Sequence, residues 1–294
     1  MEKKLLFLIN PRAGKRKSYA PLYEAAEIFC RAGYLLKIYQ TAARGDATAY
    51  VRDHGCEYDL VVCCGGDGTL NEVVNGLVQL PSPPPLGYIP RGSTNDFAAS
   101  LGIPGDVMQA AQKIVNGQPQ LLDIGRFNQR CFTYVASFGA FTRASYTAPQ
   151  ASKNMLGHSA YILEGIKDLP SLRPYRVSVL ADGERIEGDF LFGAVSNSTS
   201  LAGIVHLDPQ QVTVDDGKFE LLLLRHPDTP LGLQSLVAGL LLQDYSSEGI
   251  ILRHVRQVQV VSPQALDWSL DGERCPGDTT VHIENLHRQL QFMG

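Results

Sequence analysis

The sequence has no apolar stretch long enough to cross a bilayer, a crossing that needs about 20 residues. The best candidate, residues 231–242, is interrupted by Gln234 and Ser235. Residues 5–9 are apolar too, but Asn10 ends this run well before it reaches the length of a signal-peptide core. We therefore expect a cytoplasmic protein without a membrane-spanning segment.

Basic clusters and metal-binding cysteine motifs are also missing. The chain carries 26 Lys and Arg against 30 Asp and Glu, a net charge of −4, and it has no polybasic run, which argues against nucleic-acid binding. The six cysteines form no disulfide framework and no CxxC pair of the kind that zinc sites use. Cys63 and Cys64 lie in an apolar stretch, so we expect reduced, mostly buried thiols.

What the sequence does contain is a glycine-rich loop between a predicted strand and a predicted helix. Residues 59–64 are mostly apolar, three glycines surround Asp67 in residues 65–68, and a helical pattern begins near Thr69. Glycine loops and helix N-termini bind phosphate through backbone N–H groups. A carboxylate beside a polyphosphate is repelled unless a metal ion lies between them, so Asp67 predicts Mg²⁺. The alternative is a turn with a purely structural role, and the loop matches neither the GxxxxGK motif nor the GxGxxG fingerprint.

Helix and strand patterns alternate in the first part of the chain and then give way to short strands. The first part predicts strands at 4–9, 34–40, 59–64 and 86–89 and helices at 18–32, 45–54, 69–79, 95–101 and 105–116. This alternation indicates a mostly parallel sheet with helices on both faces. From about residue 121 the patterns indicate mainly antiparallel β structure, with an Asp-Gly hairpin at 181–184 and helices at 153–168 and near 230–243.

Two more polar loops follow strands of the predicted parallel sheet. Residues 10–14 follow the first strand, and residues 91–96 follow the fourth. Loops after parallel strands emerge at one edge of the sheet, where open α/β folds bind ligands. We therefore expect both loops, and Thr41 after the second strand, to meet the glycine-rich loop at one nucleotide. Taken alone, the first loop is typical of an Asn-Pro turn and the second of a capped helix start.

Phosphate transfer to an alcohol needs a proton acceptor, and the seven histidines form no Ser/His/Asp pattern. Carboxylates are the alternative. Residues 269–273 place Asp271 and Glu273 on either side of a glycine, and a second Asp-Gly pair lies at 216–217, before an apolar strand. By themselves, both segments are most simply turns.

Six sequence blocks extend these observations over nearly the whole chain. They are Asn-Pro-Arg-Ala-Gly-Lys (10–15), Gly-Gly-Asp-Gly-Thr-Leu-Asn-Glu (65–72), Pro-Arg-Gly-Ser-Thr-Asn-Asp-Phe-Ala (90–98), Leu-Asp-Ile-Gly (122–125), Val-Asp-Asp-Gly (214–217) and Leu-Asp-Gly-Glu (270–273). Their order resembles the diacylglycerol kinase catalytic-domain family, which includes soluble bacterial lipid kinases and the eukaryotic sphingosine and ceramide kinases. The resemblance implies an α/β fold: a Rossmann-like nucleotide domain, similar to that of NAD kinases, over residues 1–122, and a mainly antiparallel β-sandwich domain for the lipid over residues 123–283. Residues 284–294 would return to the first domain.

The resemblance also implies the site residues. The residues that would contact ATP are Asn10, Pro11, Arg12, Ala13, Gly14, Thr41, Gly65, Gly66, Asp67, Gly68, Thr69, Leu70, Asn71, Glu72 and Thr94. Glu273 would be the catalytic base with support from Asp271, and Asp67 would hold the Mg²⁺ of the nucleotide. A structural Mg²⁺ would be held by the ligands Asp216 and the backbone carbonyls of Thr213 and Lys218.

These patterns predict an ATP- and Mg²⁺-dependent kinase that phosphorylates a lipid alcohol, with diacylglycerol as the leading substrate and phosphatidic acid as its product. To reach the lipid, such an enzyme would contact the membrane surface transiently. The alternatives are an NAD kinase, whose family shares the Gly-Gly-Asp-Gly loop, and a nucleotide-binding regulatory protein of the same fold. The segment 91–97 favours the lipid kinases, and the presence of both Asp67 and Glu273 favours an enzyme. An exposed sheet edge is expected to support a homodimer.

Overall fold

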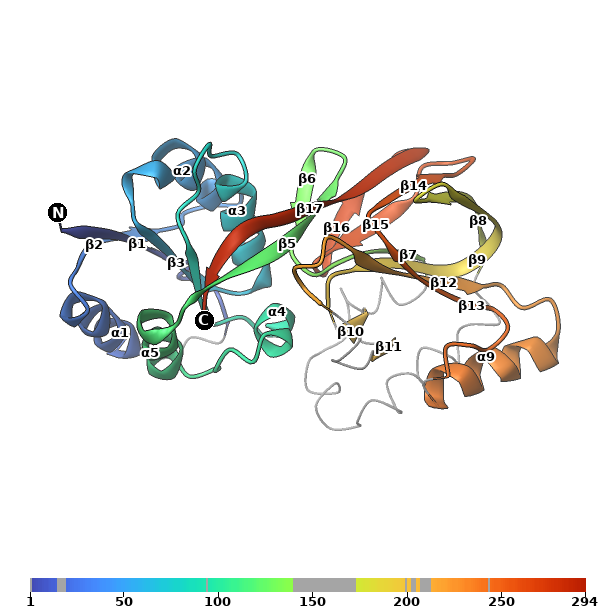
Figure 1. The fold of residues 1–294 in the computed structure, drawn as a ribbon, viewed down its shortest axis with the longest axis horizontal. Coiled ribbons are helices and arrows are strands. Elements are labelled where there is room, and N and C mark those ends of the chain that lie inside the picture. The colour runs from blue at the N-terminus through green and yellow to red at the C-terminus, as the bar shows by residue number, and fades with distance from the viewer. Residues whose placement is uncertain are drawn as a thin grey trace. The chain divides into compact units, whose positions relative to one another are not determined.

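The computed structural model describes residues 2–14, 20–93, 95–139, 173–198, 200–201, 205–206, 213–242 and 244–294. The chain divides into two compact units. The first consists of Met1–Ile124 and Arg288–Gly294, and the second of Gly125–His287. Figure 1 shows the elements of both units. The helix predicted at 153–168 lies outside the described residues.

The first unit contains a parallel sheet. Its strands are β1 (Lys3–Ile9), β2 (Tyr34–Gln40), β3 (Leu60–Gly65) and β4 (Leu86–Pro90). Strand β1 lies between β2 and β3, and β3 pairs with β4, all in parallel. The end of the last strand, β17 (Thr280–Met293), adds in parallel to β4. Every residue of β3 is buried, which explains its continuous apolar sequence.

Helices cover both faces of this sheet (Figure 1). They are α1 (Ala20–Arg31), α2 (Asp46–His54), α3 (Asp67–Leu77), α4 (Asp96–Ser100) and α5 (Val107–Asn116), with a 3₁₀ helix at Gly55–Glu57. Helix α1 packs against α5, and α2 packs against α3. Gly76 permits the second contact, because a Cβ atom there would lie 2.8 Å from Cβ of Val51 and 2.9 Å from the carbonyl oxygen of Thr48.

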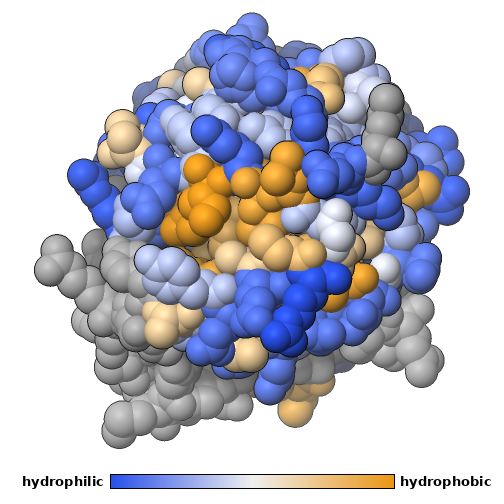
Figure 2. Space-filling view, turned by 90° about the vertical axis from the view of Figure 1, so that its left-hand side faces the viewer, coloured by the Kyte–Doolittle hydropathy of each residue, from blue (hydrophilic) through white to orange (hydrophobic). Residues whose placement is uncertain are grey.

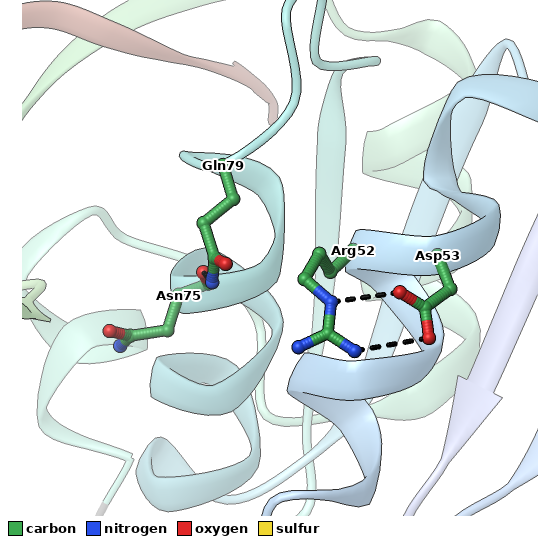
Figure 3. A network of polar contacts seen from close by, with 4 residues as sticks. All are labelled: Arg52, Asp53, Asn75 and Gln79. Carbon is green, nitrogen blue, oxygen red and sulfur yellow. Dashed lines mark hydrogen bonds and ion pairs between the residues drawn. The ribbon is translucent and has the colours of Figure 1, made fainter.

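Polar side chains lie at the C-terminal ends of α2 and α3 (Figure 3). Arg52 and Asp53 of α2 share two hydrogen bonds, 2.8 Å from Nε to Oδ1 and 3.1 Å from Nη2 to Oδ2. In the turn after α3, the Gln79 side chain donates to the backbone carbonyl of Asn75. Neither of these exposed contacts joins α2 to α3. The packing at Gly76 and the hydrogen bond from Oγ1 of Thr48 to the carbonyl of Glu72 (2.8 Å) do.

Strand β2 forms one edge of the sheet, since among the described residues it pairs only with β1. Two of its apolar side chains are largely open to solvent, Leu35 at 55% and Ile38 at 50% exposed. Figure 2 views the molecule from the end where β2 lies in Figure 1 and shows apolar side chains grouped in the middle of that face. The homodimer expected from an exposed sheet edge stays a prediction.

The chain re-enters the first unit near its end. At Arg288 the backbone turns left-handed (φ 52°), and its N–H donates to Oδ1 of Asp123 at 2.7 Å. Asp123 is 1% exposed, so this is a buried attachment point. Beyond it, Phe292 packs edge-on against Phe97 of α4, with ring centroids 5.7 Å apart. The last strand therefore completes both the sheet and the core of this unit.

The second unit is mainly antiparallel. Its strands are β5 (Pro119–Phe127, which begins in the first unit), β6 (Arg130–Phe132), β7 (Val135–Gly139), β8 (Tyr175–Ala181), β9 (Glu184–Ser196), β10 (Ser200–Leu201), β11 (Val205–His206), β12 (Phe219–Arg225), β13 (Ile250–Val255), β14 (Gln257–Val261), β15 (Asp267–Leu270), β16 (Glu273–Pro276) and the first part of β17. They pair in the order β16-β15-β7-β9-β8-β14-β17, and β12 pairs with β9 and β13. Helix α9 (Pro230–Leu242) lies between β12 and β13 in the chain.

The core of this unit is centred on Trp268, the single tryptophan of the chain, which is 1% exposed. The rings of Phe138 and Phe127 lie edge-on to it, with centroids at 4.9 and 5.0 Å. The predicted hairpin is present between β8 and β9: Asp182 and Gly183 have φ of 46° and 94°, the positive values that a two-residue type I′ turn needs.

The predicted fold class, an α/β fold whose parallel sheet is followed by mainly antiparallel β structure, is confirmed. Within the described ranges, no helix has the length and apolar character to span a membrane.

Candidate active site

The loops after β1, β2 and β4 are each tied to the end of a neighbouring strand. Three backbone hydrogen bonds do this: Thr41 N–H to Ile9 O (3.0 Å), Asn10 N–H to Cys64 O (2.9 Å) and Arg91 N–H to Gly65 O (2.7 Å). The bonds step across the sheet in the strand order β2, β1, β3, β4. They bring the loops that the sequence analysis selected together at the carboxyl edge of the parallel strands.

The glycines of these loops are needed for packing one loop against the next. A Cβ atom on Gly92 would lie 2.6 Å from Cα of Gly66 and 2.7 Å from Oδ1 of Asn95. Gly14 has a φ of 69°, and a Cβ atom there would lie 2.2 Å from the carbonyl oxygen of Arg91. These loops could not approach each other this closely with a side chain at Gly92 or Gly14.

This packing predicts that Gly92→Ala lowers the free energy of unfolding by about 1–3 kcal/mol, because the backbone of Gly66 has to move away from the new methyl group. Urea denaturation followed by circular dichroism measures the change. Gly105→Ala is the matched control, because a Cβ atom at Gly105 meets nothing within 4 Å and its φ is not positive. Equal stability of the two variants would contradict the role assigned to the loop contact.

The turn after β1 is fixed against the start of α3 by Asn10. Its Nδ2 donates to Oγ1 of Thr69 at 2.8 Å, and its Oδ1 accepts from the N–H of Arg12 at 2.9 Å. Its carbonyl accepts from the N–H of Ala13 at 3.2 Å, which closes the turn. Pro11 and Ala13 are half-buried, while the Arg12 side chain is exposed. The predicted segment 10–14 therefore reaches the glycine-rich loop as one ordered turn.

Helix α3 begins at Asp67, earlier than the predicted start near Thr69, because Gly66 has an extended backbone (φ −94°, ψ −178°) and serves as the N-cap. Asp67 therefore lies in the first turn, where the helix dipole stabilises a carboxylate. Its Oδ2 accepts from the N–H of Asp96 at 3.2 Å, which ties the loop after β4 to α3.

The donors around Asp67 are those that Mg²⁺ prefers. Asp67 supplies hard carboxylate oxygens beside the backbone of Asp96, and polyphosphate oxygens complete a Mg²⁺ site in many nucleotide enzymes. The described residues contain no group of three or more His, Cys, Asp or Glu side chains placed to hold a metal by themselves. The Asp67 carboxylate is the kind of oxygen donor that suits a Mg²⁺ ion shared with phosphate oxygens.

The other predicted residues of the glycine-rich segment 65–72 differ in burial. Thr69, Leu70 and Asn71 are buried, Gly68 is half-buried, and Oε1 of Glu72 accepts from the N–H of Gly45 at 2.8 Å. Thr94 lies outside the described residues.

In the second unit, Glu273 follows a tight turn between β15 and β16. Asp271 and Gly272 form this turn with φ of 49° and 81°, and Glu273 pairs with Leu270 as the first residue of β16. The Glu273 side chain is exposed. A rigid two-residue turn thus presents this carboxylate to solvent.

The carboxylate of Asp271 holds that turn onto a different part of the sheet. It accepts four hydrogen bonds: Thr133 N–H to Oδ2 (2.7 Å), Thr133 Oγ1 to Oδ2 (2.9 Å), Tyr134 N–H to Oδ1 (3.0 Å) and Val135 N–H to Oδ1 (3.1 Å). Asp271 is 4% exposed. With two donors on each oxygen, its acceptor capacity is filled, so its carboxylate positions the turn that carries Glu273.

The segment predicted to hold a structural Mg²⁺ forms a turn before β12. Oδ1 of Asp216 accepts from the N–H of Lys218 at 2.9 Å, around Gly217, whose φ is 79°. The carbonyl of Lys218 accepts from Nδ2 of Asn285 at 3.3 Å. Thr213 and Asp216 are exposed. One carboxylate and two backbone carbonyls are hard oxygen donors, and such a set suits a Mg²⁺ ion that keeps several waters.

Comparison with known proteins identifies the family. The profile of the diacylglycerol kinase catalytic domain matches residues 4–127. The diacylglycerol kinase of Bacillus subtilis (strain 168) is 35% identical to this chain over 99% of the chain and 96% of its own length. The chain belongs to the diacylglycerol kinase family. It is a lipid kinase, a phosphotransferase with an alcohol acceptor.

Other relatives agree with this assignment. The lipid kinase is 37% identical to a diacylglycerol kinase of Staphylococcus epidermidis (strain ATCC 12228 / FDA PCI 1200), with 99% of the chain and 92% of the relative covered. The crystal structure of a putative diacylglycerol kinase from Bacillus anthracis str. Sterne superposes with a TM-score of 0.79 at 26% identity, over 99% of this chain and 97% of that one. The prediction of an enzyme of this family is therefore confirmed.

Two buried thiols lie in β3, just before the glycine-rich loop of the candidate site. Cys63 and Cys64 occupy the end of β3, and burial raises the pKa of both thiols, that of Cys64 to about 12 although the Arg91 guanidinium opposes the shift. Both groups stay protonated at neutral pH, which excludes them as thiolate nucleophiles.

The candidate site also depends on contacts that the sequence did not predict. Asn95 takes a left-handed backbone (φ 53°), accepts from the N–H of Gly92 at 2.8 Å and donates to its carbonyl at 3.0 Å. The backbone of residues 133–135, which binds Asp271, lies in an unremarkable apolar segment. Asparagine tolerates positive φ, so Asn95 carried a weak signal; residues 133–135 carried none.

Proposed function

We propose that this lipid kinase uses ATP and Mg²⁺ and transfers the γ-phosphate of ATP to the hydroxyl of a lipid alcohol. We propose diacylglycerol as this alcohol. One observation carries the proposal: the loops after all four strands of the parallel sheet meet at one edge, around Asp67 and the N-terminus of α3. The names of the relatives support diacylglycerol as acceptor. The first unit would then be the nucleotide domain, and the second, a mainly antiparallel domain, would contribute the base.

In the proposed reaction, Glu273 accepts the proton of the acceptor hydroxyl. The hydroxyl oxygen forms a bond to the γ-phosphorus while the bond from that phosphorus to the bridging oxygen breaks, so that ADP leaves and the proton remains on Glu273. Asp271 acts through the turn, because its four hydrogen bonds fix the backbone from which Glu273 projects.

Asp67 would hold Mg²⁺ on the phosphates, with the helix start and the glycine-rich loop donating N–H groups. When bound, the ion neutralises charge on the phosphate oxygens during transfer. The segments 10–14 and 65–72 bind and orient the nucleotide through backbone groups, which the contact between Asn10 and Thr69 keeps in register. The lipid acceptor implies contact with a membrane surface from the cytoplasmic side.

Phosphate transfer from ATP labelled in the γ-position tests the proposal directly. The purified enzyme is given Mg²⁺ and, separately, diacylglycerol, phosphatidylglycerol, ceramide, sphingosine and NAD. Label in phosphatidic acid is the expected result. Label in another lipid would identify that lipid as the acceptor in place of diacylglycerol, and label in NADP would overturn the assignment of a lipid substrate.

The proposed structural Mg²⁺ predicts a metal-dependent gain in stability without nucleotide. Mg²⁺ that binds only the folded state at 100 times its dissociation constant stabilises by about 2.7 kcal/mol, so the melting temperature should rise as MgCl₂ is added. Asp216→Ala should remove most of this rise, because it removes the only side-chain ligand. Asp228→Ala, at an exposed aspartate outside the proposed site, should retain it. The same response in both variants would contradict the site.

A further inference from the structure

The loop after β2, residues 41–45, is held near both of its ends by carboxylates. Near its start, Oδ2 of Asp46 accepts from the N–H of Ala42 at 2.7 Å. At its end, Oε1 of Glu72 accepts from the N–H of Gly45 at 2.8 Å. Asp46 is the first residue of α2 and Glu72 lies in the middle of α3, so the loop is tied to two helices. Its residues 42–45 are exposed, so these bonds, more than core packing, define its path.

The anchor at the start of the loop extends back to β2 through Tyr39. The Tyr39 hydroxyl donates to Oδ1 of Asp46 at 2.8 Å. This hydrogen bond, followed by burial, raises the pKa of Tyr39 to about 12, so the phenol stays a donor at neutral pH. The Tyr39 ring also stacks on Tyr50 of α2, with centroids 3.7 Å apart and planes at 20°. Asp46 is therefore oriented by a side chain that is itself rigid.

The anchored loop contains Thr41, which the family resemblance places against the nucleotide. Thr41 is half-buried, and its N–H donates to the carbonyl of Ile9, next to Asn10 in the adjacent loop. The end anchor, Glu72, belongs to the glycine-rich segment, and its own backbone carbonyl accepts from Oγ1 of Thr48 at 2.8 Å. A change at Tyr39 or Asp46 is thus transmitted to Thr41 through the loop backbone.

We infer that Tyr39 and Asp46 are positioning residues for the nucleotide: they hold the 41–45 loop so that Thr41 stays aligned with the loops after β1 and β3. Neither side chain is assigned a contact with ATP, and both act through the backbone of this loop. Glu72 serves as the second anchor. The inference rests on the proposed function, because it takes ATP as the ligand of this edge of the sheet.

Tyr39→Phe tests the inference with a matched control. The substitution removes one hydroxyl and its bond to Asp46 but leaves a ring that stacks on Tyr50. Tyr50→Phe removes the hydroxyl of the stacking partner, which lies 3.4 Å from the hydroxyl of Tyr58. Calorimetric titration with ATP and Mg²⁺ gives the dissociation constant, and steady-state kinetics separate KM for ATP from kcat.

We expect Tyr39→Phe to raise the dissociation constant and KM for ATP about 3- to 10-fold with kcat unchanged, since a hydrogen bond to a charged acceptor is lost from the anchor of the loop. Asp46→Asn should weaken ATP binding at least as much. In Tyr50→Phe, the dissociation constant for ATP should stay within about twofold of the wild-type value. An unchanged dissociation constant in Tyr39→Phe, or equal weakening in Tyr50→Phe, would overturn the inference and leave the proposed function intact. A wild-type enzyme that binds no ATP would overturn both.

Discussion

Glu273→Gln should lower kcat for phosphate transfer about 10²- to 10⁴-fold, the range that a general base contributes. Glutamine keeps the size of the side chain but cannot accept the hydroxyl proton. The dissociation constant for ATP should stay within about twofold, because every residue predicted to bind the nucleotide lies in the first unit and Glu273 lies in the second. Transfer of labelled phosphate to the lipid and calorimetric titration with ATP measure the two quantities.

The control for this prediction is Glu187→Gln. Glu187 is an exposed glutamate on β9 whose contact with Arg185 is a surface ion pair, so its loss should change neither rate nor stability by a measurable amount. If Glu273→Gln retained a rate within about tenfold of wild type, the base would have to be another group.

Asp271→Asn should lower the free energy of unfolding of the second unit by about 2–4 kcal/mol. The new NH₂ group cannot accept a hydrogen bond: if it faces Thr133, the N–H of Thr133 is buried without an acceptor, and if it faces residues 134 and 135, two N–H groups are. Because Trp268 is the single tryptophan and lies in the core of this unit, its fluorescence during urea denaturation reports the unfolding of this unit. The displaced turn should also lower kcat.

The chain offers a matched control in its other Asp-Gly turn. Asp182 occupies the same turn position between β8 and β9, and its carboxylate accepts from the N–H groups of Arg256 and Gln257, both at 2.9 Å, but it is exposed. Water replaces lost partners there, so Asp182→Asn should cost about 1 kcal/mol or less. Equal losses in the two variants would show that burial of the Asp271 network is not what stabilises the turn.

The strand limits of the first unit could be predicted well from the pattern of apolar residues and turn residues. Strand β2 has the predicted limits, and β1, β3 and β4 differ from prediction by a single residue at one or both ends. Apolar runs bounded by glycine, proline and asparagine carry this information, because burial on both faces leaves little choice of residue. The start of α3 was less well predicted, since the capping role of Gly66 depends on its backbone angles.

The candidate site was predictable as a set of segments but not as a set of contacts. The rule that loops after parallel strands meet at one edge of the sheet predicts that residues 10–14, Thr41 and the glycine-rich loop lie together. It did not show that Gly92 and Gly14 are required because the loops touch each other, or that Glu72 binds the N–H of Gly45. The assignments of Glu273 as base and Asp67 as metal ligand stay predictions.

Sequence alone therefore determined the order of the elements in the first unit, the loops proposed to bind the nucleotide and the family, because these follow from hydrophobic period, turn residues and short motifs. Only the tertiary structure decided that Asp271 is a buried anchor rather than a simple turn residue, and that Tyr39 and Asp46 brace the loop at Thr41. The reason is physical. The partners of Asp271 are 136–138 residues away in the chain, and a carboxylate's role depends on the donors and burial that the path of the backbone brings to it.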